Sequence, residues 1–477
     1  MGCGSSNLII PPEDFAYFCL TFHWVDTIRL IHANPRTIHL IRKALQLYWK
    51  GGISSQNWSY GALDMELAGR PFVKGAGKEE TYNCKKAINH LAEFLLADGW
   101  SIVKSSDLSR TMSQTTWFLR RGAQPSKEAA PATFASVSMS STDGLQVAGA
   151  NKALFESVKD ALQATYSKGV KIASDLGDGD YFLQLNGHPW TSEAEEGMDA
   201  RRFILELVRR WQALRYFFYT TANMKGTADT LFFVHHPDNN GDNKPSEYCM
   251  VSLNQVDRLR MVDCPEEMYP IVRSCIHRYR GKEMIQKESE VHGTHEFKLK
   301  GSPWCAEAQD VVYARLLIAK MMEALHSVGW RVHMSVDMSR KMNDKAVLLL
   351  RSVSPADAPH FCLSPADVDK LRVIGAPADA VDTIRSLLNR YWPVGIQKEN
   401  PDYYGAHEFK LKGQPWSGRQ GVDELHARSF MCFLTKELQT KGWEPVASCD
   451  VSAKHIRTEN GPDYPIDVHS WFFAKLN

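Results

Sequence analysis

Two stretches of the chain place an aspartate, a serine and a lysine at every second position. They are Asp337, Ser339 and Lys341, and Asp450, Ser452 and Lys454. On an extended strand each trio faces one way, so it could bind a polar ligand, or the lysine could activate the serine as a nucleophile. A helical arginine precedes each trio. The candidate ligand-binding residues are therefore Arg315, Asp337, Ser339, Arg428, Asp450 and Ser452.

The same residues have a structural interpretation, which we favour. The aspartate would cap a hairpin or pair with the helical arginine, and the serine would bond local backbone. Buried charges are normally paired in this way. The trio is also incomplete elsewhere, because Asn223 and Lys225 replace the aspartate and serine in one copy, and Thr111 replaces the lysine in another. We therefore predict no catalytic residue.

Other reactive side chains lack the spacing that chemistry requires. His295-Glu296 and His407-Glu408 are neighbours on predicted strands and point to opposite faces, so neither pair can chelate one ion. We expect these strands to keep their charged face in water, with each glutamate opposite a lysine. The ten cysteines show no zinc spacing, and phosphate-binding glycine fingerprints and Gly-x-Ser-x-Gly are absent. We predict no metal and no cofactor.

The N-terminus carries a different kind of chemistry. The chain begins Met1-Gly2-Cys3-Gly4-Ser5-Ser6, which fits the N-myristoylation pattern after removal of the methionine. One myristoyl chain binds membranes only marginally, so a second signal is needed. Residues 7–14 contain no Lys or Arg, which leaves Cys3 as a palmitate acceptor. We predict lipidation at Gly2 and Cys3; the alternative is a chance run of small residues.

The elements that position these residues belong to an internal repeat. Gly-x-Pro followed by an aromatic residue occurs four times, at intervals of about 115 residues. The four begin at Gly69, Gly187, Gly301 and Gly413. A second aromatic follows each glycine after 29 to 31 residues, at Trp100, Tyr216, Trp330 and Trp443. A base stands fifteen residues before that aromatic, at Lys85, Arg201, Arg315 and Arg428. Because the tryptophans recur at fixed places, we predict that they pack in cores.

Hydrophobic periodicity in the fourth copy predicts the fold of a unit. Residues 361–363 and 370–374 are expected strands, 380–391 and 425–438 amphipathic helices, and 408–412, 444–451 and 469–474 further strands. The order strand-strand-helix-strand-helix-strand-strand predicts an α+β fold of two layers, a largely antiparallel sheet with two helices. The chain would comprise an acylated leader (1–12) and four modules (13–121, 132–236, 247–352 and 360–477), the second degenerate.

The seven residues from His295 to Gly301 are identical to those from His407 to Gly413, and Pro-Trp follows each run closely. Tandem units with this Glu-Phe-Lys-Leu-Lys-Gly-x-Pro-Trp signature resemble an uncharacterised family of eukaryotic α/β repeat proteins. The start of the chain resembles the dually acylated N-termini of cytoplasmic signalling proteins. These resemblances imply a family and a membrane anchor, and they imply no activity.

Composition limits the possible functions. The chain has 477 residues, with 56 Lys+Arg against 55 Asp+Glu, and this balance argues against general nucleic-acid binding. We therefore predict a scaffold or adaptor without catalytic activity. Its N-terminal lipids would hold it at the cytoplasmic face of a membrane, where it would bind protein partners that the sequence does not identify. The alternative is a small-molecule-binding protein or enzyme whose sites survive only in modules 3 and 4.

Overall fold

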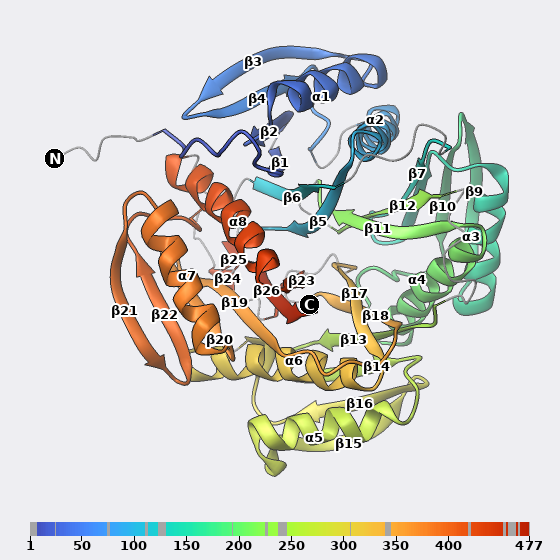
Figure 1. The fold of residues 1–477 in the computed structure, drawn as a ribbon. Coiled ribbons are helices and arrows are strands. Elements are labelled where there is room, and N and C mark those ends of the chain that lie inside the picture. Colours follow the sequence, from blue (N-terminus) through green and yellow to red (C-terminus); the bar gives the residue numbers. More distant parts are fainter. Residues whose placement is uncertain are drawn as a thin grey trace.

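Each copy of the repeat folds into a six-stranded antiparallel sheet that carries two helices (Figure 1). The computed structural model describes residues 7–23, 25–73, 77–109, 113–122, 130–192, 194–224, 228–236, 246–305, 307–338, 345–417, 421–451, 455–456, 464–465 and 468–476. Gly2, Cys3, Ser339 and Ser452 lie outside these residues.

Modules 1 and 2 have the same order of elements. Module 1 contains β1 (Tyr17–His23), β2 (Thr27–Ile31), α1 (Pro35–Tyr48), β3 (Ile53–Ser59), β4 (Ala62–Leu67), α2 (Lys78–Ala97), β5 (Trp100–Ser106) and β6 (Ser113–Arg121). Module 2 contains β7 (Thr133–Ser140), β8 (Gly144–Ala148), α3 (Lys152–Thr165), β9 (Val170–Gly177), β10 (Asp180–Leu185), α4 (Glu195–Ala213), β11 (Tyr216–Ala222) and β12 (Thr230–His235).

Modules 3 and 4 repeat this order with short additions. Module 3 contains β13 (Tyr248–Asn254), β14 (Arg258–Val262), α5 (Met268–Arg280), β15 (Ile285–Val291), β16 (Thr294–Leu299), α6 (Gln309–Ser327), β17 (Trp330–Val336) and β18 (Val347–Ser352), with 3-10 turns at Lys282–Met284 and Pro303–Cys305. Module 4 contains β19 (His360–Ala366), β20 (Lys370–Ile374), α7 (Ala378–Tyr391), β21 (Ile396–Tyr403), β22 (Ala406–Leu411), α8 (Val422–Thr440), β23 (Trp443–Cys449), a hairpin of β24 (His455–Ile456) and β25 (Tyr464–Pro465), and β26 (Ser470–Lys475).

The predicted α+β class and the largely antiparallel sheets are confirmed, with one more strand per module than predicted. In module 1 the strand order is β3-β4-β2-β1-β6-β5, and the other sheets follow the same plan. The extra strand is β3, β9, β15 or β21, which pairs with the strand that follows it. It is an exposed edge strand, and β21 reads Ile-Gln-Lys-Glu-Asn-Pro-Asp-Tyr. Such a polar segment lacks the apolar alternation that marks a strand in sequence.

The four modules form a closed ring (Figure 1). The second helix of each module packs on the first strand of the next, so that α2 contacts β7, α4 contacts β13, α6 contacts β19, and α8 returns to β1. The first strands are therefore covered on both faces, and every residue of β1, β13 and β19 is buried. Strands covered on both faces read as continuous apolar runs, as in Tyr17–His23.

The edge strands β5, β11, β17 and β23 meet at the centre of the ring (Figure 1). Each carries an irregularity in its pairing at the same place, three residues after the aromatic that begins the strand. Such bulges bend and twist a strand. Here they turn the four strands toward one another about a common axis.

The chain crosses three of the four seams between modules, whereas non-covalent contacts alone close the seam between modules 4 and 1. Phe15 lies against Phe433 of α8, with ring centres 4.7 Å apart. The hydroxyl of Tyr17 donates to Gln439 Oε1 at 2.5 Å. One hydrophobic cluster contains Leu8, Phe15 and the apolar residues of α8, so the N-terminal segment is part of this seam.

Candidate functional site

Arg428 of α8 is fully buried and reaches into module 1. Its Nε donates to Thr21 Oγ1 at 3.2 Å and to Thr116 Oγ1 at 3.1 Å, and its Nη2 donates to Ser109 Oγ at 3.0 Å. Nη1 lies 3.0 Å from Glu424 Oε1 one turn back on the same helix. The helix thus brings the charge of Arg428, paired with Glu424, to hydroxyl groups of the neighbouring sheet.

The other three recurring bases make the same kind of contact. Arg315 Nε donates to Ser470 Oγ in module 4 at 2.8 Å, and Arg201 Nε donates to Ser252 Oγ in module 3 at 2.8 Å. Lys85 bonds Ser138 and Gln146 in module 2. The base that recurs in the sequence is therefore a tie between one module and the next, and we call these contacts the seam ties.

The binding-site hypothesis grouped each arginine with an aspartate and a serine of its own module. In the structure each arginine reaches the next module instead of that aspartate. The serine that Arg428 bonds is Ser109 of module 1, and Arg428 also influences the nearby Asp107. Arg315 bonds Ser470 of module 4 as well as the carbonyl of Val311 in its own helix. Arg315 and Arg428 both have 0% exposed surface, so neither guanidinium is open to a ligand from solvent. These contacts cross seams and cannot be deduced within one repeat.

The recurring aspartate holds modules together through its backbone. Asp337 donates its N–H to Asp229 Oδ2 of module 2 at 2.7 Å, and its carbonyl accepts the N–H of Asp229 at 3.0 Å. Asp107 pairs with His469 of module 4 in the same way. Asp107 Oδ1 also accepts the N–H of Ser109 at 3.1 Å, which is the expected local cap. Asp450 lies at the end of β23, beside segments outside the described residues.

The glutamates of the two His-Glu sequences form ion pairs with arginines. Glu296 is 2% exposed and accepts from Arg260 Nε at 2.6 Å and from Arg258, while Glu408 accepts from Arg372 Nε at 2.7 Å. The expectation that this strand face lies in water is wrong for both glutamates, since the face also borders the preceding module. Arg260 and Arg372 stand directly opposite these glutamates on the neighbouring strand, where lysines were expected. No His/Cys/Asp/Glu cluster that could hold a metal occurs among the described residues.

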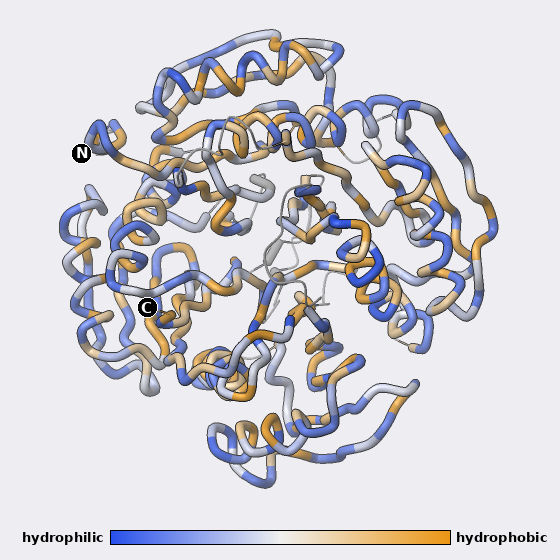
Figure 2. Tube along the Cα trace, turned by 45° about the vertical axis from the view of Figure 1, so that its right-hand side comes forward, coloured by the Kyte–Doolittle hydropathy of each residue, from blue (hydrophilic) through white to orange (hydrophobic). Residues whose placement is uncertain are grey.

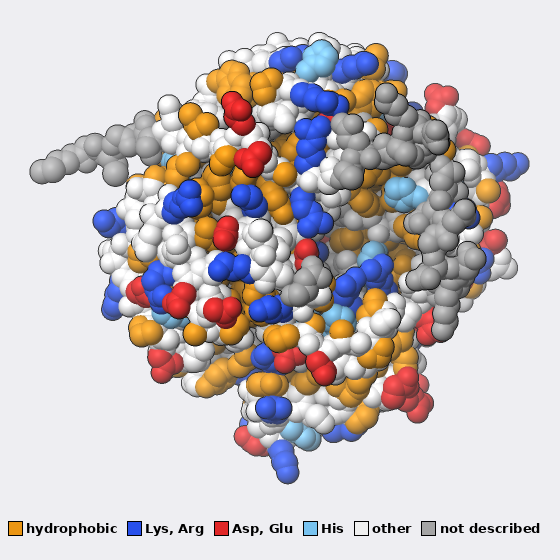
Figure 3. Space-filling model, in the orientation of Figure 1, with side chains coloured by type: hydrophobic (Ala, Val, Ile, Leu, Met, Phe, Trp, Pro, Cys, Tyr) orange, Lys and Arg blue, Asp and Glu red, His pale blue; other side chains and the backbone are white. Residues whose placement is uncertain are grey.

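Cations gather near the axis of the ring. Arg331 of β17 stands directly opposite Arg351 of β18, and like charges in this position repel. Within the described part of the chain neither forms an ion pair, and Arg351 Nε is buried without a hydrogen-bond partner. Lys104 lies close by, with its Nζ 3.0 Å from Val446 O, and burial lowers its pKa to about 8. Figure 3 shows Lys and Arg side chains near the middle of this face.

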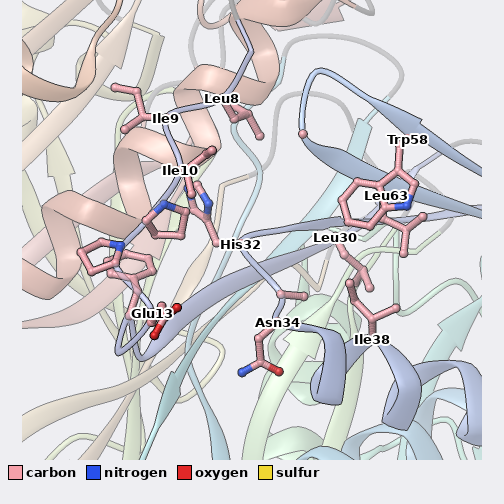
Figure 4. A pocket seen from close by; sticks show the side chains of 15 residues that line it. Leu8, Ile9, Ile10, Glu13, Leu30, His32, Asn34, Ile38, Trp58 and Leu63 are labelled. Carbon is pink, nitrogen blue, oxygen red and sulfur yellow. The ribbon is translucent and has the colours of Figure 1, made fainter.

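A separate apolar cavity of about 260 Å³ lies where the N-terminal segment crosses module 1 (Figure 4). Leu8, Ile9 and Ile10 form one side, and Leu63 and Trp58 lie across from them. The N–H of Leu8 donates to Tyr60 O at 2.8 Å and fixes the segment. This cavity was not predicted from the sequence. The sequence signal for it was the run Leu8-Ile9-Ile10-Pro11-Pro12, because consecutive apolar residues need an apolar partner.

The recurring tryptophans are core residues, as predicted. Trp190, Trp304 and Trp416 are at most 2% exposed. Each donates its indole N–H to the carbonyl of a residue at the start of the second strand, at 2.8 Å, namely Gly144, Arg258 and Lys370. A buried indole with this partner is satisfied, so these side chains are not available for ligand stacking.

Comparisons with known proteins agree with the repeat. The model of one domain family matches residues 16–120, 133–234, 247–351 and 359–474. Among solved structures, the crystal structure of a conserved kinetoplastid-specific protein from Trypanosoma cruzi matches 25% of this chain and 98% of its own. The two are 18% identical, with a TM-score of 0.18. A comparison with curated proteins finds no match.

Proposed function

Since the chain belongs to the family of that tandem domain, we propose that it is a membrane-anchored, cytosol-facing scaffold or adaptor without catalytic activity. One observation carries the proposal: the polar residues shared by the modules are used in the seam ties. Lys85, Arg201, Arg315 and Arg428 are buried and bonded across seams. A shared catalytic set would instead line a cavity open to substrate.

The outward surface differs between modules, as a scaffold with several partners requires. The edge strand β9 exposes Val170, Ile172 and Leu176, at 36%, 45% and 51%. The corresponding strand β21 exposes Gln397 and Lys398. Exposed edge strands offer unpaired backbone groups to an added strand. Each module can thus present its own edge to a partner while the seam ties keep the four edges at fixed positions.

The N-terminal residues Gly2 and Cys3 supply the proposed anchor by myristoylation and palmitoylation. In the described residues no helix is long and apolar enough to cross a bilayer. Asn7 to Pro12 begins the described chain at the rim of the ring, where Figure 2 shows hydrophobic positions next to the label N. The rim position gives the anchor access to a membrane without rearrangement of the modules.

Labelling and fractionation test the anchor. Gly2→Ala should abolish incorporation of labelled myristate and move the protein from membrane to soluble fractions. Cys3→Ser should retain the label and weaken membrane attachment, because one acyl chain binds marginally. Gly4→Ala serves as the matched control. A wild-type protein that is wholly soluble and unlabelled would show that the anchor is wrong.

The scaffold role has its own test. Ile172→Lys with Leu176→Lys changes only exposed side chains of β9 and should preserve thermal stability. It should reduce the set of proteins crosslinked to the intact chain, whereas Val256→Lys on another exposed site should not. An unchanged set of crosslinked proteins would exclude β9 as a partner surface.

The axial cations favour the alternative, a small-molecule-binding protein. Arg331 and Arg351 form no ion pair with the described residues, and with Lys104 nearby they would bind a phosphate or carboxylate group. Inorganic phosphate should then raise the melting temperature of the wild type, and Arg351→Gln should remove the increase. An equal effect of phosphate on both proteins would exclude this site.

A further inference from the structure

The cavity beside the N-terminal segment has an apolar interior. Leu30, Ile38 and Leu63 of module 1 line it, and Ile10 and Trp58 at its mouth are 89% and 65% exposed. Leaving large apolar side chains in water is unfavourable by the hydrophobic effect. An apolar occupant would cover both residues.

The polar residues on the wall already have partners. Asn34 caps α1, with its Oδ1 accepting the N–H of Thr37 at 2.8 Å. His32 Nε2 lies 2.7 Å from Ser429 Oγ, and burial lowers the pKa of His32 to about 4, so the ring is neutral at pH 7. Among the described residues that line the wall, the one charged group is Glu13, which is exposed. The interior therefore offers little to a polar ligand and suits a hydrocarbon chain.

The size of the cavity also suits a hydrocarbon chain. An apolar cavity of about 150 Å³ holds one benzene ring, so by proportion 260 Å³ holds roughly ten carbon atoms. Drug-sized ligands occupy about 300 Å³ or more. An acyl chain can fill the cavity and lay its remaining carbons along Ile10 and Trp58 at the mouth.

The chain itself carries a suitable occupant. The cavity wall begins at Leu8, and Gly2 precedes Leu8 by six residues, which span at most about 20 Å. We propose that the cavity binds the myristoyl chain of Gly2 of the same molecule. This rests on the proposed acylation. When the cavity holds the myristoyl group, that group is not available to insert into the membrane.

The proposal gives the two acylation sites different roles. A single myristoyl chain holds a protein at a bilayer only marginally, and a tethered group meets its own cavity at an effective concentration in the millimolar range. The cavity therefore competes with the membrane while Gly2 alone is acylated. Palmitate on Cys3 adds a second acyl chain, for which the cavity has no room. Palmitoylation therefore favours the membrane-bound state of the protein.

Vesicle binding tests the proposal on the full chain, co-expressed with N-myristoyltransferase in bacteria and carrying Cys3→Ser. Ala33→Trp fills the cavity and should raise the fraction bound to phosphatidylcholine vesicles about three- to tenfold. Ala376→Trp, at the matching position of module 4, is the control and should leave the fraction unchanged. If Ala33→Trp fails to fold, Trp58→Lys at the exposed mouth should give the same increase. Equal binding by wild type and the cavity variant would overturn the proposal.

A fluorescent fatty acid, dansyl-undecanoic acid, identifies the occupant. It should bind the unacylated chain, bind the Ala33→Trp variant at least tenfold more weakly, and be excluded from the myristoylated chain. Equal binding to acylated and unacylated protein would show that the cavity takes another apolar group, such as a free lipid or a side chain of a partner. Mass spectrometry of the native protein separately tests acylation, so a missing myristate contradicts the proposed function without affecting the cavity measurement.

Discussion

The guanidinium of Arg428 bonds the hydroxyl of Thr21, 407 positions earlier in the chain, with 3.2 Å between Nε and Oγ1. This contact joins the last helix of module 4 to the first strand of module 1, where no peptide linker crosses the seam. The same guanidinium holds the buried Glu424. Closure of the ring therefore includes a charge that is fully buried, beside the apolar and backbone contacts of the same seam.

Arg428→Met should destabilise the protein by about 3–5 kcal/mol, because it leaves Glu424 buried without its partner. The midpoint of urea unfolding measures the change. The double variant Glu424→Gln with Arg428→Met removes the stranded charge and should recover part of the loss. Arg390→Met on the exposed face of α7 is the control, and an equal effect of both methionine variants would contradict the role of the tie.

Asp229 makes stability depend on pH. Burial raises its pKa from 3.8 to about 7, so between these values the folded protein binds a proton that the unfolded chain releases. Stability is therefore lost as the pH rises from about 4 to 7. Asp229→Asn should raise the melting temperature at pH 8 and change it little at pH 4. Scanning fluorimetry across this range measures the effect, and a shift that is equal at both pH values would exclude it.

Glu296 and Glu408 occupy equivalent strand positions with different numbers of partners. Glu296 bonds both Arg258 and Arg260, whereas the hydrogen bond of Glu408 goes to Arg372. Removing a buried partner costs about 3–5 kcal/mol. Glu296→Gln should approach this value and exceed the effect of Glu408→Gln in chemical denaturation. A larger effect in module 4 would show that the second arginine contributes nothing.

Trp304 tests the predicted core role of the Pro-Trp signature. Its indole N–H satisfies the carbonyl of Arg258, and Trp304→Phe leaves that buried acceptor unpaired at a cost of about 1–3 kcal/mol. The thermal midpoint should fall clearly. Trp58→Phe, at a 65% exposed position, should leave the thermal midpoint unchanged within error. A similar fall in both variants would contradict the stabilising role of the Trp304 hydrogen bond.

Sequence alone predicts the fold of a unit well where periodicity is strong. The expected helices over 380–391 and 425–438 correspond to α7, Ala378–Tyr391, and α8, Val422–Thr440. The strand β20, Lys370–Ile374, has the expected bounds. The strand β21 was missed because both of its faces are largely polar and it contains Pro401. An edge strand needs only one hydrogen-bonded neighbour, so its sequence is weakly constrained.

The seam ties lay beyond the reach of sequence periodicity. The repeat correctly identified Arg315 and Arg428 as special positions, but not the module that each one contacts. In the ring, the second helix of each module contacts the first strand of the next module. The spacing of residues within one repeat would be the same if that helix contacted its own module, so the spacing does not reveal the partner. The serines and threonines that receive the bonds, such as Ser252 and Thr21, stand in strands that read as apolar runs. Only the arrangement of the modules reveals them.

The location of the N-terminal segment has a mechanical consequence. Phe15 lies against Phe433 at the seam between modules 4 and 1, so the proposed lipid anchor at Gly2 would pass tension from a loaded ring first to that seam. The other three seams are backed by peptide linkers, which do not separate under load. A pulled molecule would therefore open at one defined joint into a chain of four modules, and the strength of that joint would set the force that the protein can transmit through the proposed anchor.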